Sequence, residues 1–297
     1  MEFIRIIIYD LVMRYRIIIS ACFLCFLNAC SGNSPGSVKD TTLKPVDSVA
    51  FQRSITTKKE AGLKTIHVFV ALCDNKYQGI VPVPAKIGNG QDAATNLYWG
   101  AAFGVKTFFN KSSEWKLIEI KKNPAANILE RILFKHKTKN VFLLADGYDG
   151  QYIKQTTIDF LNAAAGKKDE QVIYQKDTLY FGGASQLTSY IGHDGLMDFS
   201  LLPMTPSTES SNRQAIILAC YSRNYFTPHL RSAGAFPLVW TTGLMAPEAY
   251  TLHDALHEWA QNNSNEEIKL AAAKAYSKFQ KCSLKAARNL LVSGWGE

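Results

Sequence analysis

The feature that most constrains the fold is a series of short apolar runs that alternate with longer amphipathic segments. The runs are rich in Ile, Val, Leu and Phe and are bounded by Gly, Asp, Asn or Ser, which is typical of strands buried on both faces. We expect strands at Thr65–Cys73, Trp115–Ile120, Asn140–Ala145, Ser189–Ile191, Ala215–Ala219 and Pro237–Thr242. Alternation of such strands with helices predicts an α/β fold, with a mainly parallel sheet and helices on both faces.

The segments between and after these runs carry helix signals, such as an acidic residue or a proline at the first turn. We expect helices at Asp92–Phe109, Pro124–Lys137, Ile153–Ala165, Tyr225–Ala233, Pro247–Asn262, Glu266–Phe279 and Ser283–Val292. Gln171–Phe181 predicts a hairpin or another β excursion from the main sheet.

Polar residues follow several of the expected strands. In a parallel sheet with right-handed crossovers, successive strands end at the same edge, where ligands and reactive groups collect. The residues placed there are Asp74, Asp146, His193, Cys220 and Thr242. The sequence therefore predicts a site at the carboxyl edge of the sheet.

His193 and Cys220 are the two residues of this set that suit nucleophilic chemistry. A neutral imidazole accepts a thiol proton, and an imidazolium beside a thiolate lowers the thiol pKa. Each residue also has a simpler interpretation, because a Cys after an apolar run is often buried and inert and a His at a strand end often bonds locally. Their joint position favours a dyad with a thiol pKa below its ordinary value.

The pattern of an apolar run, His and Gly, followed by an apolar run and Ala-Cys, resembles the clan CD cysteine peptidases, which include caspases, legumain, clostripain and gingipains. The resemblance implies a caspase-like, three-layer αβα fold, a catalytic dyad of His193 and Cys220, and an oxyanion site made by amides near Gly195 and at Cys220. In this chain Asp194 stands between His193 and Gly195. Asp194 either orients His193 or is a turn residue, and Asp before Gly favours the turn.

Two carboxylates at the same edge bear on specificity. Asp74 and Asp146 would favour a cationic partner if they line a pocket, and clan members with acidic pockets cleave after Arg or Lys. The other interpretation is that these residues begin loops or cap helices. We expect a substrate pocket that includes Asp74 and Asp146.

Other classes of function have weaker support. A non-catalytic binding lipoprotein on the same scaffold is the main alternative, and Asp194 favours it. His253 and His257 share a helix face, as in zinc hydrolases, but the spacing offers no third ligand. The chain has no Walker loop to bind phosphate, and the absence of a Gly-x-Ser-x-Gly motif argues against an α/β-hydrolase. We expect no metal and no other cofactor. The net charge of +8 is spread over short basic segments, so we expect no nucleic-acid partner.

The N-terminal segment is typical of an exported protein. Arg14 and Arg16 precede the apolar run Ile17–Leu27, which is too short to span a membrane as a mature helix. The tetrapeptide Leu27–Cys30 resembles a bacterial lipobox, which implies acylation of Cys30 and, because Ser31 follows, an outer-membrane lipoprotein in the cell envelope. An ordinary signal peptide or an uncleaved anchor stays open, as does a start at Met13.

This pattern divides the chain into three parts. We expect a signal peptide at residues 1–29, a polar tether at 30–62, and a single α/β domain at 63–297. The expected partners are the membrane, through the lipid on Cys30, and a peptide or protein substrate. Cys73, Cys220 and Cys282 cannot all pair within one chain, so at least one should be a free thiol.

Replacing Cys30 tests the lipid anchor. Cys30→Ser should abolish fatty-acid labelling and release the protein from the membrane fraction, because the acylated thiol is lost. Cys22→Ser is the matched control and should leave labelling unchanged. Palmitate incorporation that persists in Cys30→Ser would contradict lipidation at this residue.

Overall fold

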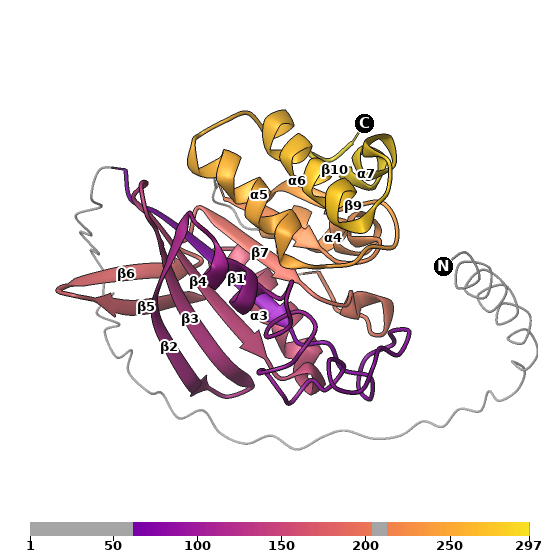
Figure 1. Cartoon of the computed structure of the whole chain (residues 1–297), viewed down its shortest axis with the longest axis horizontal. Coiled ribbons are helices and arrows are strands. Elements are labelled where there is room, and N and C mark those ends of the chain that lie inside the picture. The colour runs from indigo at the N-terminus through magenta and orange to yellow at the C-terminus, as the bar shows by residue number, and fades with distance from the viewer. Residues whose placement is uncertain (1–61, 204–212, 297) are drawn as a thin grey trace, which may run out of the picture. The chain divides into compact units, whose positions relative to one another are not determined.

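The computed structural model describes residues 62–203 and 213–296, which belong to one compact unit, Thr57–Glu297. The expected signal peptide, Cys30 and nearly all of the tether lie outside the described residues. The described chain forms an eight-stranded sheet in the order β10-β9-β8-β7-β1-β4-β3-β2 (Figure 1). The strands are β1 (Lys64–Ala71), β2 (Trp115–Ala125), β3 (Ile128–His136), β4 (Val141–Tyr148), β7 (Leu187–Ile191), β8 (Gln214–Leu218), β9 (Phe236–Thr241) and β10 (Leu291–Val292).

The centre of the sheet is parallel and its edges are antiparallel. Strands β4, β1, β7, β8 and β9 pair in parallel, whereas β3 and β2 continue the sheet antiparallel on one side and β10 on the other. The prediction of a mainly parallel sheet is confirmed.

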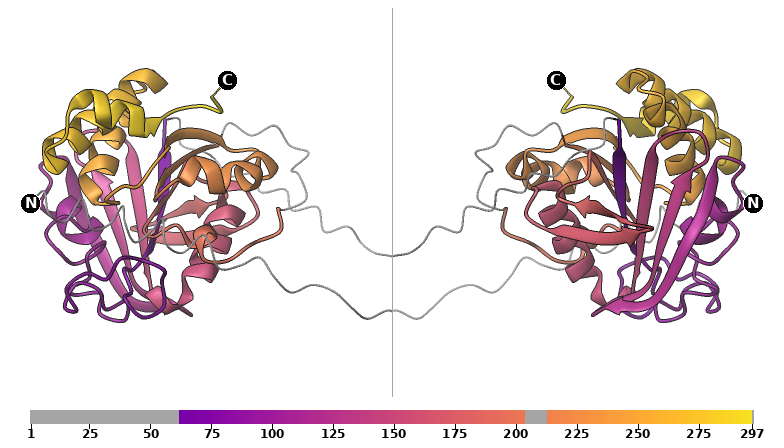
Figure 2. Two further views of the ribbon diagram at one scale, coloured as in Figure 1. Left: turned by 90° about the vertical axis from the view of Figure 1, so that its right-hand side faces the viewer. Right: turned by 90° about the vertical axis from the view of Figure 1, so that its left-hand side faces the viewer.

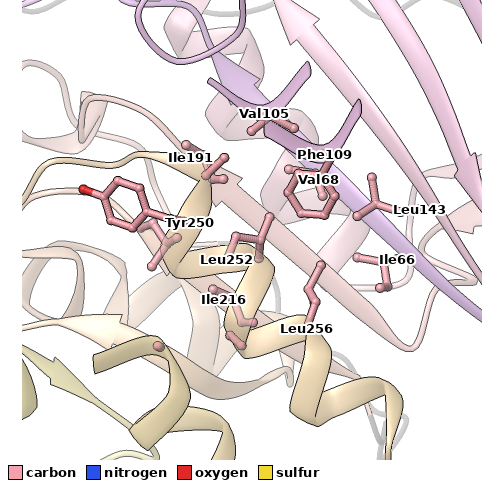
Figure 3. Close-up of a cluster of buried hydrophobic side chains, with 14 of the residues drawn as sticks. Ile66, Val68, Val105, Phe109, Leu143, Ile191, Ile216, Tyr250, Leu252 and Leu256 are labelled. Atoms are coloured by element: carbon pink, nitrogen blue, oxygen red, sulfur yellow. The ribbon is translucent and has the colours of Figure 1, made fainter. Parts of the chain in front are cut away.

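Helices cover both faces of this sheet, so the described domain has three layers, αβα (Figure 2). They are α2 (Val105–Lys111), α3 (Ile153–Ala164), α4 (Ser222–Ala233), α5 (Ala249–Ala260), α6 (Asn265–Gln280) and α7 (Leu284–Leu290). Along β1, Ile66 and Val68 face the core that α2, α5, α6 and α7 cover, and Phe69 faces the core shared with α3 and α4 (Figure 3). This alternation follows from the two-residue period of a strand.

The expected helix at Pro124–Lys137 is wrong, because this segment is part of the β2–β3 hairpin. Its apolar residues come in adjacent pairs at a spacing that suits a helix, but a strand buried on both faces has the same pattern, and β3 is largely buried on both. Asn127 makes the turn with a φ of 66°, a left-handed conformation that Asn tolerates well.

The expected helix at Asp92–Phe109 is also wrong for most of its length. Turns occupy the segment up to Gly104, and the helix α2 begins only at Val105. The buried Asn96 side chain accepts a hydrogen bond from the Cys73 N–H at 3.0 Å and donates to the Cys73 carbonyl at 2.8 Å. This pairing fixes the segment against the end of β1, where a regular helix would not fit.

The remaining elements agree with expectation apart from shifts at their ends, except that the helix expected at Ser283–Val292 ends at Leu290 and its last two residues, Leu291 and Val292, pair with β9 as the strand β10. Gln171–Phe181 is a separate hairpin of β5 (Asp169–Tyr174) and β6 (Asp177–Gly182). The strand expected at Asn140–Ala145 continues to Tyr148, so Asp146 lies inside β4 and not at its end. No helix within residues 62–203 and 213–296 combines the length and the hydropathy that a membrane span requires.

Asp146 belongs to a buried ionic network. Its carboxylate accepts hydrogen bonds from Arg131 at 2.6 and 2.8 Å and contacts Nε2 of His67 at 3.0 Å, and Arg131 also pairs with Glu170 at 2.7 Å. Burial opposes the charge on Asp146, but the hydrogen bonds from Arg131 and His67 outweigh burial and hold its pKa below the ordinary value. The network ties β3 and β4 to the β5–β6 hairpin.

Removing the Arg131 side chain should strongly destabilise the folded protein. Arg131→Met should lower the free energy of unfolding by about 3–5 kcal/mol, because it leaves Asp146 charged and without its main partner in the interior. The matched control is Lys121→Met, whose partner Glu119 is 3.4 Å away with both side chains at least 40% exposed, and which should cost at most about 1 kcal/mol. Urea unfolding measures both, and equal losses would contradict a structural role for the network.

Candidate active site

The carboxyl edge of the parallel strands contains a topological switch point. From β1 the chain moves to β4 on one side, whereas from β7 it moves to β8 on the other side. In an open α/β sheet, the carboxyl ends of the strands on either side of such a switch point are the usual place for a ligand.

His193 and Cys220 lie at the same level beyond this edge. Ile191 of β7 pairs with Leu218 of β8, and His193 and Cys220 each follow their partner strand by two residues. The Gly192 N–H still donates to the Leu218 carbonyl at 3.3 Å, so the pairing extends past Ile191. Adjacent strands are about 4.8 Å apart, so the two residues follow neighbouring strand ends.

His193 is held by a carboxylate that sequence reasoning did not identify. Its Nε2 contacts Asp198 Oδ2 at 2.7 Å, and its backbone carbonyl accepts a hydrogen bond from the Tyr190 hydroxyl at 2.8 Å. An ionised carboxylate only accepts, so the neutral ring carries its hydrogen on Nε2 and keeps a lone pair on Nδ1. Among the described residues Nδ1 of His193 has no hydrogen-bond partner, so it is the basic nitrogen.

Asp198 is itself fixed by the loop after β1. The Gly79 N–H donates to Asp198 Oδ2 at 2.9 Å. A Cβ at Gly79 would lie 2.2 Å from Asp198 Oδ1, so a larger residue would displace this carboxylate. A chain of contacts thus runs from Gly79 in the loop after β1 through Asp198 to His193.

Cys220 lies in a sharp turn between β8 and α4. Its Sγ accepts a hydrogen bond from the Met245 N–H at 3.4 Å and lies 3.6 Å from the Met245 carbonyl. Tyr221, the next residue, has a φ of 50°, a strained backbone for an aromatic residue. Burial raises the pKa of Cys220, and the charge of Asp194 adds to this rise while the Met245 N–H opposes it. The expectation of a lowered thiol pKa is therefore wrong for this conformation.

Asp194 is completely buried. Its Oδ1 accepts a hydrogen bond from the Leu196 N–H at 3.0 Å and so caps the short helix Gly195–Met197, which confirms the turn interpretation. Its Oδ2 is buried without a hydrogen-bond partner in the described structure. Burial raises the pKa of Asp194 to about 7. A buried acid that titrates near neutrality thus lies close to Cys220.

Gly195 is buried against Phe199, since a Cβ at this position would lie 2.7 Å from the Phe199 ring. The close contact explains why a glycine follows Asp194. The role of its amide in binding an oxyanion stays a prediction.

The two carboxylates expected to bind a cationic substrate already have partners. Asp74 Oδ1 accepts from the backbone N–H groups of Lys76 and Tyr77 at 2.8 and 3.1 Å, and its Oδ2 accepts from Gln91 at 2.8 Å. Asp146 is bound by Arg131 inside the sheet. Both are at least 98% buried, so neither presents a free carboxylate at the edge.

Buried amides fix the chain that follows β1. Gln78 donates to the carbonyls of Leu72 and Gly150 at 2.7 and 3.1 Å, and Asn96 binds both backbone groups of Cys73. These contacts hold the end of β1 against the residues that follow β4. Asn and Gln in a polar loop carry no pattern that distinguishes such a role, so the sequence could not have identified them.

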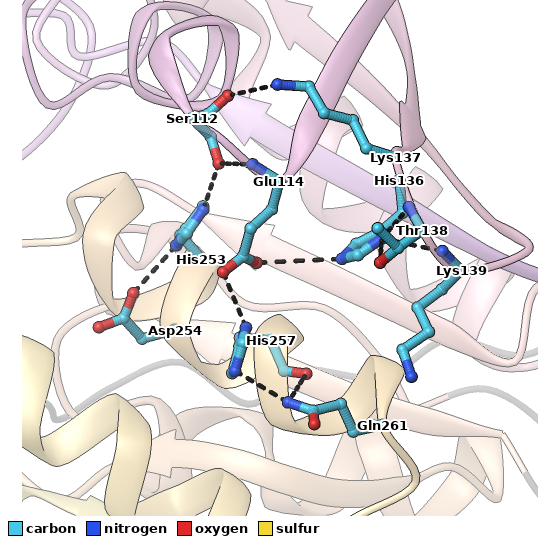
Figure 4. Close-up of polar contacts among 10 residues, drawn as sticks. All are labelled: Ser112, Glu114, His136, Lys137, Thr138, Lys139, His253, Asp254, His257 and Gln261. Carbon is cyan, nitrogen blue, oxygen red and sulfur yellow. Dashed lines mark hydrogen bonds and ion pairs between the residues drawn. The ribbon is translucent and has the colours of Figure 1, made fainter.

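The two histidines of α5, His253 and His257, belong to a cluster of polar side chains that includes Ser112, Glu114 and His136 (Figure 4). Glu114 Oε1 accepts a hydrogen bond from His257 Nδ1 at 2.8 Å, and Glu114 Oε2 lies 3.9 Å from His136 Nε2. His253 Nε2 bonds Ser112 at 2.8 Å and its Nδ1 bonds Asp254 at 2.9 Å. The cluster joins α5 to the start of β2 and the end of β3.

The contacts in this cluster do not favour a zinc hydrolase. His136 Nδ1 accepts from the N–H groups of Thr138 and Lys139 at 3.2 and 3.1 Å, which leaves its hydrogen on Nε2. Over residues 62–203 and 213–296, no group of three or more His, Cys, Asp or Glu side chains is arranged to hold a metal ion. Cys73, Cys220 and Cys282 are free thiols, as expected for at least one of them.

Comparison of the chain with protein-family models, with curated proteins and with solved structures found no match. The assignment of the site therefore depends on its own geometry.

The buried acid predicts a pH dependence of stability. Since the folded-state pKa of Asp194 is about 7 and an unfolded Asp titrates near pH 4, the folded protein binds the extra proton between these values. Stability from this group is highest below about pH 4 and falls as the pH rises to about 7. Asp194→Asn should remove this fall and be more stable than the wild type at pH 8, by up to about 4 kcal/mol.

Urea unfolding at pH 5 and pH 8 measures the effect. Asp177→Asn changes an exposed carboxyl and is the matched control, with the wild-type dependence expected. An Asp194→Asn variant that loses as much stability as the wild type between pH 5 and pH 8 would contradict a protonated Asp194.

Proposed function

We propose that this protein is an exported, lipid-anchored lipoprotein whose α/β domain is a cysteine hydrolase of the clan CD type, acting on peptide bonds. The observation that supports it most is the register of β7 and β8, in which His193 and Cys220 each follow a residue of the last pair, Ile191 and Leu218, by two positions. The Asp198 contact supplies the third group that orients a catalytic base.

In the proposed mechanism the Cys220 sulfur attacks the scissile carbonyl carbon. The thiol proton passes to Nδ1 of His193, and Asp198 stabilises the resulting imidazolium through Nε2. Backbone amides near Gly195 and at Cys220 hold the oxyanion, each donor being worth about 2.7–4 kcal/mol. The imidazolium then protonates the leaving amine, and water hydrolyses the thioester to regenerate the thiol.

Partial burial of Cys220 gives a reason for a gated site. The raised pKa of Cys220 keeps the thiol protonated in the described conformation. Substrate binding would have to release the sulfur from Met245 and bring it to His193, since catalytic contacts often tighten only in the complex. Strain at Tyr221, directly after the nucleophile, is of the kind that functional turns store.

A second candidate is a binding lipoprotein on the same scaffold without chemistry. Two features favour it, namely the raised pKa of the Cys220 thiol and the buried Asp194, whose ionisation would oppose formation of a thiolate. A preference for basic substrates is not part of either proposal, because Asp74 and Asp146 are engaged within the protein.

Labelling with a thiol-reactive peptidomimetic separates the two candidates. A hydrolase should be modified at Cys220 much faster than at Cys73, since burial raises the pKa of Cys73 to about 11. His193→Ala should slow this labelling by about 100-fold or more. Asp198→Asn should slow it about tenfold and alter its pH profile, because the imidazolium loses its partner.

Gly79→Ala tests the same chain of contacts from the other end. It should resemble Asp198→Asn in both rate and pH profile, because the added methyl displaces the carboxylate. The dyad would be contradicted if Cys73 and Cys220 of the wild type were labelled equally slowly and His193→Ala had no effect. That result would favour the binding protein.

A further inference from the structure

An open cleft lies between α6 and α7, on an element pair that the candidate active site does not use. It has a volume of about 330 Å³ and is lined by Lys269, Leu284, Lys285, Arg288 and Asn289. Residues 285, 288 and 289 are spaced i, i+3 and i+4, so they share one face of α7. Lys269 comes from α6.

The cleft belongs to the most one-sided charge distribution of the domain. Between residues 268 and 296 the chain has six basic residues and no acidic residue. Lys269 pairs with Glu266 at 2.6 Å. In the described part of the chain, the exposed side chains of Lys285 and Arg288 form neither an ion pair nor a hydrogen bond, so their charges are available to a ligand.

An apolar side chain accompanies these charges. Leu284 is 38% exposed at the rim of the cleft, next to Lys285. A small inorganic anion gains nothing from such a neighbour, whereas a lipid offers a phosphate to the cations and an apolar region to the leucine. Asn289 adds an amide donor for a phosphate or glycerol oxygen.

We propose that this cleft binds the phosphate headgroups of an anionic lipid surface. The α6–α7 face then contacts the membrane directly and fixes how the domain lies on it, in addition to any lipid at Cys30. The proposal does not depend on thiol chemistry, so the result of its test is independent of whether the protein is a hydrolase.

The test uses the mature chain from residue 30 with Cys30→Ser, which contains the whole compact unit but cannot be acylated. It should sediment with vesicles of phosphatidylcholine mixed with phosphatidylglycerol and not with phosphatidylcholine alone. Lys285→Gln with Arg288→Gln should weaken the partition constant at least about tenfold. The matched control, Lys116→Gln with Lys122→Gln, changes the net charge equally on exposed positions of β2 and should have little effect.

Two further measurements distinguish a lipid surface from a free anion. Leu284→Ser keeps every charge and should still weaken binding to the mixed vesicles, whereas inorganic phosphate at equal ionic strength should compete no better than chloride. Equal losses in the two double variants would reduce the effect to net charge and overturn the proposal. So would full competition by inorganic phosphate, which would make the ligand a free anion, or failure to bind the anionic vesicles.

Discussion

The burial of β1 is the constraint on which the rest of the structure depends. After Lys64 every residue of β1 is buried, between two neighbouring parallel strands and between two helical layers. A strand in this position has no edge and no solvated face, so its backbone and both sets of side chains must be satisfied by the surrounding elements. The switch point lies at this strand because the chain leaves β1 toward β4 and later returns beside it as β7.

The parallel strands could be predicted because burial on both faces produces continuous apolar runs that end abruptly at polar residues. The same property misled the assignment of Pro124–Lys137, since β3 is buried on both faces and its apolar spacing fits a helix equally well. Asp92–Phe109 failed for a different reason. Its conformation is set by the Asn96 contact with Cys73, which joins residues distant in sequence and has no local pattern.

In the candidate site too, some residues could be predicted from local sequence patterns and others are placed by tertiary contacts. His193 and Cys220 follow strands, so their position at one edge could be predicted from strand order alone. Asp198 and Met245 lie in loops whose paths depend on tertiary contacts, and sequence reasoning missed both. Asp146 was misplaced because β4 continues for three residues beyond the expected end, which moved its carboxylate from the edge into the sheet. The raised pKa of Asp194 arises from enclosure by the folded chain, a property that no sequence motif encodes.

The two edges of the sheet bear on how copies of the domain meet one another. If the proposed lipid anchor holds the domain at a membrane, copies of it meet at a far higher local concentration than in solution, which favours pairing between open strand edges. β10 has only two residues, and β2 has register shifts at Leu117/Glu119 and Lys122/Ala125, exposed lysines and Pro124. These features make both edge strands poor templates for an added strand. The hairpin that was mistaken for a helix therefore protects the domain from self-association through its sheet under crowding.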